Sequence, residues 1–119
     1  VELGERQFKL CMSMFEVTEC YKKLQAMETA TPKQLLSMSA SRFEINVAIR
    51  KAFIDVMANL EKCCPALTND DLFYCVLSLM HCSNIVILEL MNVSSEALKM
   101  RKSRIKGKLR EDIFEYIFC

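Results

Sequence analysis

The chain has 119 residues, of which 52% are apolar and 26% charged, with a net charge of +1 at neutral pH. That length suits one domain, or a small domain with a helical extension. Two Gly and two Pro leave little material for hairpin turns, and Leu, Met, Ala, Lys and Glu dominate, so we expect an all-α protein. The longest uncharged apolar run, residues 72–88, is polar at its centre and too short to span a bilayer.

Cysteine and histidine usage argues against catalysis and metal binding. The seven cysteines include no C-x-x-C pair, and His81 is the only histidine. We therefore interpret the cysteines as small buried hydrophobes in a reducing cytosol, and predict no zinc site. The sequence also has no Gly-rich phosphate loop, and Asp70 and Asp71 are interpreted as helix caps. We expect no enzyme, no cofactor, no metal and no small-molecule substrate. No signal peptide is visible and the chain opens with Val1, so we expect a cytoplasmic chain that is a piece of a longer protein.

Residues 2–28 are predicted to form one long helix, roughly 40 Å in length. A seam with heptad character runs along it, with alternating spacings of four and three, formed by Leu3, Gln7, Leu10, Met14, Val17, Tyr21 and Leu24. Phe8, Cys11 and Phe15 widen this apolar face. Either the seam pairs with a second subunit to make a homodimer, or it packs on its own domain. We favour the dimer, because so wide a stripe is hard to cover from within a small domain.

Two further helices are predicted before residue 65. Residues 31–34 (Thr-Pro-Lys-Gln) combine a cap, a Pro and a Gln, which predicts a short helix to about Met38. Residues 41–44 repeat the capping-box spacing and open a helix to Lys62, whose apolar face is Ile45, Ile49, Ala52, Phe53, Val56, Met57 and Leu60. Pro65 ends it, since the residue before a Pro leaves the α region. Residues 1–64 are thus interpreted as a helical N-terminal region, a dimerisation candidate and scaffold, and residues 65–119 as a separate domain.

The second half of the chain begins with two helices that open with capping residues. Thr68 is predicted to cap the first, with Asp71 at its third position and Leu67 packing onto Leu72 across the cap. Its buried face would be Leu72, Cys75, Val76 and Leu79. Ser83 is the next cap, and residues 84–91 form a short helix with Glu89 its only charge. A helix this apolar must be covered on nearly every side.

A basic helix follows after a turn at residues 92–94, capped by Ser94 or Ser95 and reaching about Leu109. Residues 94–110 carry seven positive charges and one negative charge, or +6, so the rest of the chain carries about −5. Such a concentration on one helix is the electrostatic footprint of nucleic-acid binding. The predicted inward side is Leu98, Ile105 and Leu109, with the aliphatic part of Arg101 beside them, and the outward side is Lys99, Met100, Ser103 and Lys106.

A short helix, a tight turn and a longer basic helix make a helix-turn-helix, whose second helix enters the DNA major groove. The order of its residues resembles the LuxR/FixJ-type DNA-binding domain, in the form found at the C-terminus of Bacteroidetes regulators that link tetratricopeptide repeats and a membrane span to this module. The matching residues are Leu67-Thr68, Asp71-Leu72, Ser83-Asn84, Ile87, Leu90, Val93-Ser94, Leu98, Arg101, Ser103-Arg104-Ile105 and Lys108-Leu109.

The resemblance implies a four-helix domain at residues 65–119, with residues 110–118 as its last helix. It implies contacts to DNA base edges from Lys99, Met100 and Ser103. It also implies phosphate contacts, which position the protein without reading sequence, from Lys102, Arg104, Lys106 and Lys108. The implied partners are double-stranded DNA, a second copy of the chain, and a membrane-linked sensor portion of a longer protein.

The chain departs from the family pattern at three places. Leu88 stands where the family usually has a small residue, Ile85 and Val86 where a polar pair is common, and His81 where Gly commonly ends the preceding helix. We expect a bulky Leu88 to splay the two helices, and Ile85 and Val86 to place apolar surface where DNA backbone contacts usually lie. The favoured function is a sequence-specific DNA-binding transcriptional regulator with 94–109 as its recognition helix. The alternative is a degenerate helix-turn-helix that serves as a protein-interaction or oligomerisation module.

Overall fold

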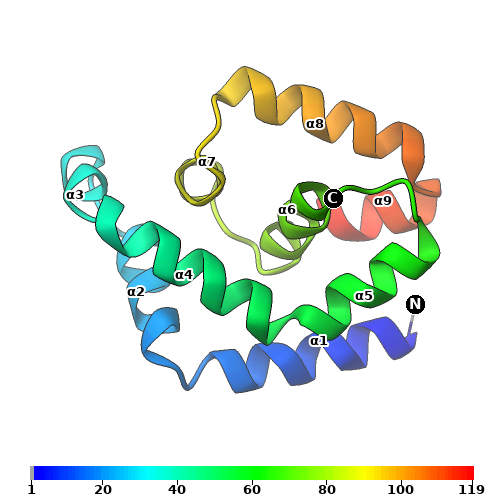
Figure 1. The fold of residues 1–119 in the computed structure, drawn as a ribbon, viewed down its shortest axis with the longest axis horizontal. Helices are drawn as coiled ribbons and strands as arrows, with labels where there is room; N and C mark the ends of the chain where they lie inside the picture. The colour runs from blue at the N-terminus through cyan, green and yellow to red at the C-terminus, as the bar shows by residue number, and fades with distance from the viewer. Residues whose placement is uncertain (1) are drawn as a thin grey trace.

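A computed structural model describes the backbone of residues 2–119 and the side chains from Gly4 onward (Figure 1). Nine helices and no strand are found in that range, which confirms the all-α prediction. The helices are α1 (Glu2–Phe15), α2 (Glu19–Glu28), α3 (Pro32–Ser37), α4 (Ser39–Ala52), α5 (Ile54–Cys63), α6 (Asn69–Leu79), α7 (Asn84–Met91), α8 (Ser95–Lys108) and α9 (Glu111–Phe118). None of these helices has the length and apolar character needed to cross a membrane.

Helix α6 occupies the centre of the molecule, and α5, α7 and α9 pack against it (Figure 1). Every residue from 71 to 77 is buried, so this helix is covered on all sides. A single hydrophobic core runs from Cys11 in α1 to Ile117 in α9. The core therefore crosses the boundary proposed after residue 64; that boundary stays a prediction, but the two halves are packed together.

The prediction of one helix over residues 2–28 is wrong, because the chain breaks between Phe15 and Glu19. Thr18 caps α2: its hydroxyl accepts a hydrogen bond from the Tyr21 N–H at 3.3 Å. The same hydroxyl donates to the Phe15 carbonyl at 2.7 Å. A Thr side chain that bonds nearby backbone groups offers the chain an alternative to continuing the helix, and here that alternative is taken. Helix α2 consequently turns away from α1 (Figure 1).

The break divides the predicted dimer seam. Leu10, Met14 and Val17 remain exposed, whereas Leu24 is buried and Tyr21 half-buried in the protein's own core. The side chain of Leu3 lies outside the described residues. Cys11 and Phe15 also face inward, so α1 packs on its own domain along this side. The seam is therefore not one continuous stripe, and the dimer itself stays a prediction.

The predicted helix over residues 41–62 is likewise two helices, with the junction at Phe53. Phe53 is fully buried, with its ring 5.4 Å from that of Phe8 and 5.9 Å from that of Phe15. Both α4 and α5 contact α1, so the bend lets the chain follow the surface of α1. The capping box predicted at Ser41 does not form, because α4 already begins at Ser39. The predicted apolar face of this stretch is buried or half-buried throughout.

The other predicted helix starts are confirmed. Capping boxes form at Thr31 with Gln34 and at Thr68 with Asp71, and the hydroxyls of Ser83 and Ser94 cap α7 and α8. These signals are local in sequence, so they could be found without knowledge of the fold.

Two helix ends use left-handed backbone. His81 follows α6 with φ 60° and Asn92 follows α7 with φ 54°. The Cys82 N–H donates to the Leu77 carbonyl at 3.1 Å, which completes a Schellman motif at the end of α6. A positive φ is the conformation that Gly adopts most easily, and here His81 adopts it.

Candidate nucleic-acid interface

The basic helix α8 runs along the outer edge of the molecule, and α7, seen nearly end-on in the same view, lies crosswise to it (Figure 1). The two helices are joined by residues 92–94. Leu98, Ile105 and Leu109 are buried, as predicted, and attach this helix to the core. Because these three lie on one side, the opposite side of α8 is left to solvent.

The outward face of α8 has Gly107, Met100 and Ser103 at its centre and cations at its margins. At 3.6 residues per turn, Gly107 lies opposite the buried side, with Met100 and Ser103 on either side of it. Lys99 and Lys106 lie on one margin, and Arg104 on the other. All of these residues are exposed, which confirms the outward positions predicted for residues 99, 100, 103 and 106. No heavy atom lies within 4 Å of the place where a Cβ of Gly107 would stand, so another molecule can approach the backbone closely there.

One flank of α8 is held by a buried carboxylate on α6. Arg101 Nη1 lies 2.7 Å from Asp71 Oδ1, and Lys108 Nζ lies 3.2 Å from Asp71 Oδ2. The side chain of Asp71 is only 5% exposed, and the Thr68 N–H donates to its Oδ2 at 3.0 Å. Lys108 was predicted to contact DNA phosphate, but this geometry commits its ammonium to Asp71. Arg101 lies where predicted and makes an ion pair that the sequence pattern did not indicate.

Asp71 is ionised in this setting. Burial by itself would raise the pKa of its carboxyl, but the hydrogen bonds from the Thr68 backbone, Arg101 and Lys108 outweigh burial and hold the pKa below its ordinary value. A buried carboxylate with two cationic partners ties α8 to α6. Removing one partner of a buried pair typically costs about 3–5 kcal/mol, because the remaining charge is left uncompensated.

The opposite flank of α8 rests on aromatic rings of α9. Lys102 Nζ lies 5.5 Å from the centre of the Phe118 ring, and Lys106 Nζ lies 5.8 Å from that of Phe114. Such contacts are worth about 0.5–1 kcal/mol at exposed sites and leave the positive charge uncancelled. These two lysines are therefore positioned without being neutralised.

The seven cations between Lys99 and Arg110 thus fall into two groups. Three make ion pairs with carboxylates: Arg101 and Lys108 with Asp71, and Arg110 with Asp112 at 2.8 Å. The other four have no carboxylate partner in the described part of the chain; they are Lys99, Lys102, Arg104 and Lys106. The unpaired group supplies the positive charge on the exposed side of α8.

Helix α4 supports α7 and the turn between α7 and α8. The Asn46 side-chain amide donates to the Leu90 carbonyl in the last turn of α7 at 3.1 Å. Arg42 lies 3.5 Å from Glu89 and 3.3 Å from the side-chain oxygen of Asn92 in the turn. This region was predicted to be scaffold, and these residues were not singled out. Arg42 and Asn46 are i, i+4 neighbours, but α4 carries several other polar side chains, so the spacing alone does not indicate their role.

Of the four residues that differ from the LuxR/FixJ-type pattern, two are covered and two, His81 and Ile85, are exposed. Val86 is buried and Leu88 half-buried, whereas Ile85 is 59% exposed. Val86, Ile87 and Leu90 all belong to the core. The expectation that α7 is covered on nearly every side therefore holds except at Ile85.

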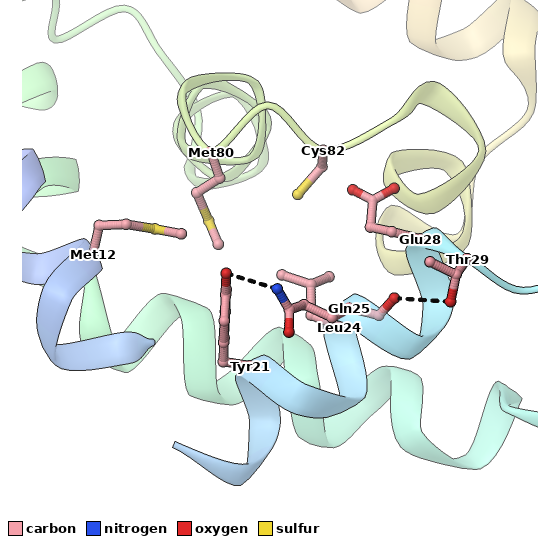
Figure 2. A pocket seen from close by; sticks show the side chains of 8 residues that line it. All are labelled: Met12, Tyr21, Leu24, Gln25, Glu28, Thr29, Met80 and Cys82. Atoms are coloured by element: carbon pink, nitrogen blue, oxygen red, sulfur yellow. Dashed lines mark hydrogen bonds between the residues drawn. The ribbon is translucent and has the colours of Figure 1, made fainter. Parts of the chain in front are cut away.

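A separate cavity of about 240 Å³ lies where the predicted seam turns inward (Figure 2). Tyr21 and Leu24 line it together with three sulfur-bearing side chains, Met12, Met80 and Cys82. Burial, with the nearby Glu28 carboxylate adding to it, raises the pKa of Cys82 to about 12, so its thiol stays protonated at neutral pH. Among the described residues, no group of three or more His, Cys, Asp or Glu is placed to hold a metal ion.

Comparison of the chain with family models, with curated proteins and with solved structures finds no match. The arrangement of its own residues is therefore the basis for assigning an activity. Of the features described, the exposed side of α8 is the one whose charge and shape point to a particular class of partner.

Proposed function

We propose that this chain binds double-stranded DNA by placing α8 in the major groove, and that it regulates transcription. The observation that carries the proposal is the set of four cations without carboxylate partners on the open side of α8. A flexible basic segment would also attract nucleic acid, but it would not present its side chains in a fixed pattern. Here Leu98, Ile105 and the Asp71 ion pairs hold the helix from behind, so the pattern is preserved.

The dimensions of α8 suit this role. Fourteen residues give a helix about 21 Å long, and the major groove admits one α-helix. In the proposed complex Lys99, Met100 and Ser103 contact base edges: a Lys can bond the acceptors of guanine, and an apolar side chain can contact the thymine methyl group. The absence of a large side chain at Gly107 lets the helix approach the groove closely.

The phosphate contacts in this proposal come from Lys102, Arg104 and Lys106. Lys102 and Lys106 are held at the α9 side of the helix by the rings beneath them, which directs them toward one DNA strand. Lys108 is omitted from this set because of its ion pair with Asp71. These contacts would fix the register of the protein on DNA, and the three residues on the outer face would read the sequence.

A homodimer would present two such helices about one DNA turn apart, on a target with twofold character. Leu10 and Met14 offer the dimer surface, together with Val17 in the turn after α1, since all three are more than 60% exposed. The likeness to LuxR/FixJ-type regulators supports the same proposal, including a sensor portion in a longer protein.

The experiment is a salt titration of binding to a pool of random duplexes, followed by selection and sequencing of the bound fraction. With three phosphate contacts per subunit, the log–log slope of affinity against salt should be about −2.7 per subunit. Lys33→Ala, at an exposed position on α3, serves as the control for general loss of charge. If no duplex binds at low salt, the chain is instead a helical protein-interaction module.

That alternative would use the apolar 85–91 stretch and the terminal helix. Most of this surface is already occupied within the chain: Val86, Ile87 and Leu90 are buried in α7, and Phe114 and Ile117 in α9. Ile85 and Tyr116 are the large apolar side chains that remain exposed in these two helices. The DNA-binding proposal is favoured because the exposed surface of the motif is cationic rather than apolar.

A further inference from the structure

A second groove, on the side of the molecule formed by α1, α5 and α9, has the dimensions of a ligand site. Its volume is about 410 Å³, within the range of roughly 300–1,000 Å³ common for small-molecule pockets. Its walls are mainly aliphatic and aromatic, formed by Phe8, Val56, Leu60, Leu79, Ile113 and Ile117. Residues more than a hundred positions apart in sequence meet here, and one side of the groove opens to solvent.

The polar groups of the groove are unevenly distributed. Asn59 donates a hydrogen bond from its side-chain amide to that of Gln7, which joins α5 to α1 at the groove. Lys62 also lines the groove, and its ammonium makes no ion pair within the described residues. Burial and then the nearby Glu5 carboxylate raise the pKa of Tyr116 on the α9 wall. Glu5 itself does not line the groove, and Lys62 is the one charged residue among those that do.

We propose that this groove binds a single amphiphile with an unbranched apolar chain and a carboxylate head group. The chain would lie against Phe8, Leu60 and Ile117, and the head group would pair with Lys62, away from Glu5. A neutral molecule would leave the Lys62 ammonium unused, and a cationic one would be repelled by it. The one charged residue of the lining, Lys62, therefore favours an anion.

Helix α9 forms one wall of the groove and also contacts the basic helix α8. Ile113, Tyr116 and Ile117 of α9 line the groove, while Phe114 and Phe118 of the same helix lie beneath Lys106 and Lys102 of α8. An occupied groove would therefore restrict α9 and, through it, the two lysines. Any change in DNA binding that follows from this restriction rests on the proposed function, whereas binding of the amphiphile does not.

Two exposed cysteines make the test specific. Cys63 lines the groove, and Cys119 lies at the C-terminus and does not line it. The full chain is treated with N-ethylmaleimide, with decanoate, decanol or decylamine present below its micelle concentration, and the modification rate at each cysteine is measured by peptide mass spectrometry. We expect decanoate to slow modification of Cys63 and to leave Cys119 unchanged.

A charge variant tests the head group. Lys62→Gln should need about tenfold more decanoate for the same protection, because a charge-assisted hydrogen bond is lost. Protection by decanol should be weaker than by decanoate in the native chain and unchanged in the variant. Lys51→Gln, at an exposed position on α4 outside the groove, is the matched control and should behave as the native chain.

Three results would overturn the proposal: no protection of Cys63 by decanoate, equal protection of Cys63 and Cys119, or protection by decanoate that is the same in Lys62→Gln. The assay contains no DNA, so its outcome is independent of whether the chain binds a duplex. Protection without any duplex binding would keep the ligand site and overturn only the function proposed for α8.

Discussion

The two flanks of α8 carry the same kinds of side chain but hold them in different ways. On one flank Arg101 and Lys108 lie 2.7 and 3.2 Å from the buried carboxylate of Asp71, which compensates their charge within the protein. On the other flank Lys102 and Lys106 lie over the rings of Phe118 and Phe114, and their charge stays available to a partner. From the sequence, Lys102, Lys106 and Lys108 were all predicted to contact phosphate, and Arg101 was predicted to lie beside the inward side. A count of positive charge therefore overstates the surface available to DNA, because the environment of each cation decides its role.

The largest expected effect comes from removing the carboxylate that holds the first flank. Asp71→Ala should lower the free energy of unfolding by about 3 kcal/mol, because it leaves Arg101 and Lys108 unpaired and removes the capping-box partner of Thr68. Urea unfolding followed by circular dichroism measures the change. The neighbouring Asp70 is the matched control, since its side chain is 62% exposed and pairs with Arg50 at the surface.

Asp70→Ala should cost less than about 1 kcal/mol, as is usual for a surface pair. If the two alanine variants unfold at the same urea concentration, Asp71 does not hold α8 as described.

The second comparison separates the flanks by DNA binding. Lys106→Ala should weaken binding to all duplexes about equally and make the salt slope shallower by about 0.9, because a phosphate contact is lost. Lys108→Ala should leave the salt slope unchanged while lowering stability, because this ammonium already pairs with Asp71. Fluorescence anisotropy over a range of salt concentrations measures both. Equal changes in slope for the two variants would contradict the division between the flanks.

A third variant, Lys99→Ala, distinguishes a residue that contacts base edges from one that contacts phosphate. Lys99→Ala should relax the sequence preference at one base pair, with a loss of about 1–3 kcal/mol of discrimination. Competition between the selected duplex and single-base changes of it measures the effect. Should Lys99→Ala and Lys106→Ala weaken every duplex to the same extent, the proposed roles of these residues would be wrong.

The Asp71 ion pairs also predict a pH dependence. The pKa of Asp71 is lowered in the folded state, so its stabilising contribution is complete above the ordinary Asp value of 3.8 and is lost as the pH falls through the lower, folded-state pKa. Stability should therefore decline below about pH 4, and Asp71→Asn should flatten that part of the profile. Urea midpoints collected from pH 2.5 to 6, bracketing the roughly 4 at which Asp ordinarily titrates, test this. A variant whose acid profile parallels that of the native chain would assign the decline to other carboxylates.

The smallest effect concerns the centre of the outward face. Gly107→Ala should raise stability by about 0.5–1 kcal/mol, since Gly107 is helical and a Cβ there meets no atom within 4 Å. The same change should weaken DNA binding if the backbone approaches the groove closely at this point. Thermal unfolding and anisotropy measure the two effects. A variant that is more stable and binds equally well would place the contact elsewhere on α8.

Short-range signals in the sequence predicted much of the fold, and long-range contacts account for what was missed. The caps at Thr68, Ser83 and Ser94 could be found because a capping residue acts within three positions of itself. The break at Phe53 depends on rings from α1, and the role of Asp71 depends on residues 30 and 37 positions away. Asp71 was correctly identified as a cap residue. Its second function, accepting hydrogen bonds from Arg101 and Lys108 of α8, leaves no signal in the neighbouring sequence.

The same distinction applies to the candidate sites. The outward positions of Lys99, Met100 and Ser103 follow from helical spacing alone and were predicted. The groove lined by Phe8, Leu60 and Ile117 could not be, because three helices distant in sequence form it. Likewise, the predicted seam is not continuous, because the chain turns at Thr18, whose hydroxyl bonds the Phe15 carbonyl. Heptad spacing carries no information about such a bond.

The shared core, which joins α4 to α7 and α5 to α6, has a consequence for how the molecule comes apart. Residues 65–119 cut out alone would lose the packing of α4 on α7 and of α5 on α6, the hydrogen bond from Asn46 to α7 and the contact of Arg50 with the Phe73 ring. Such a fragment should be largely unfolded, whereas the whole chain should melt in one cooperative transition. The backbone amides of α8 should then exchange only through global unfolding, because Leu98 and Ile105 attach this outer helix to the core.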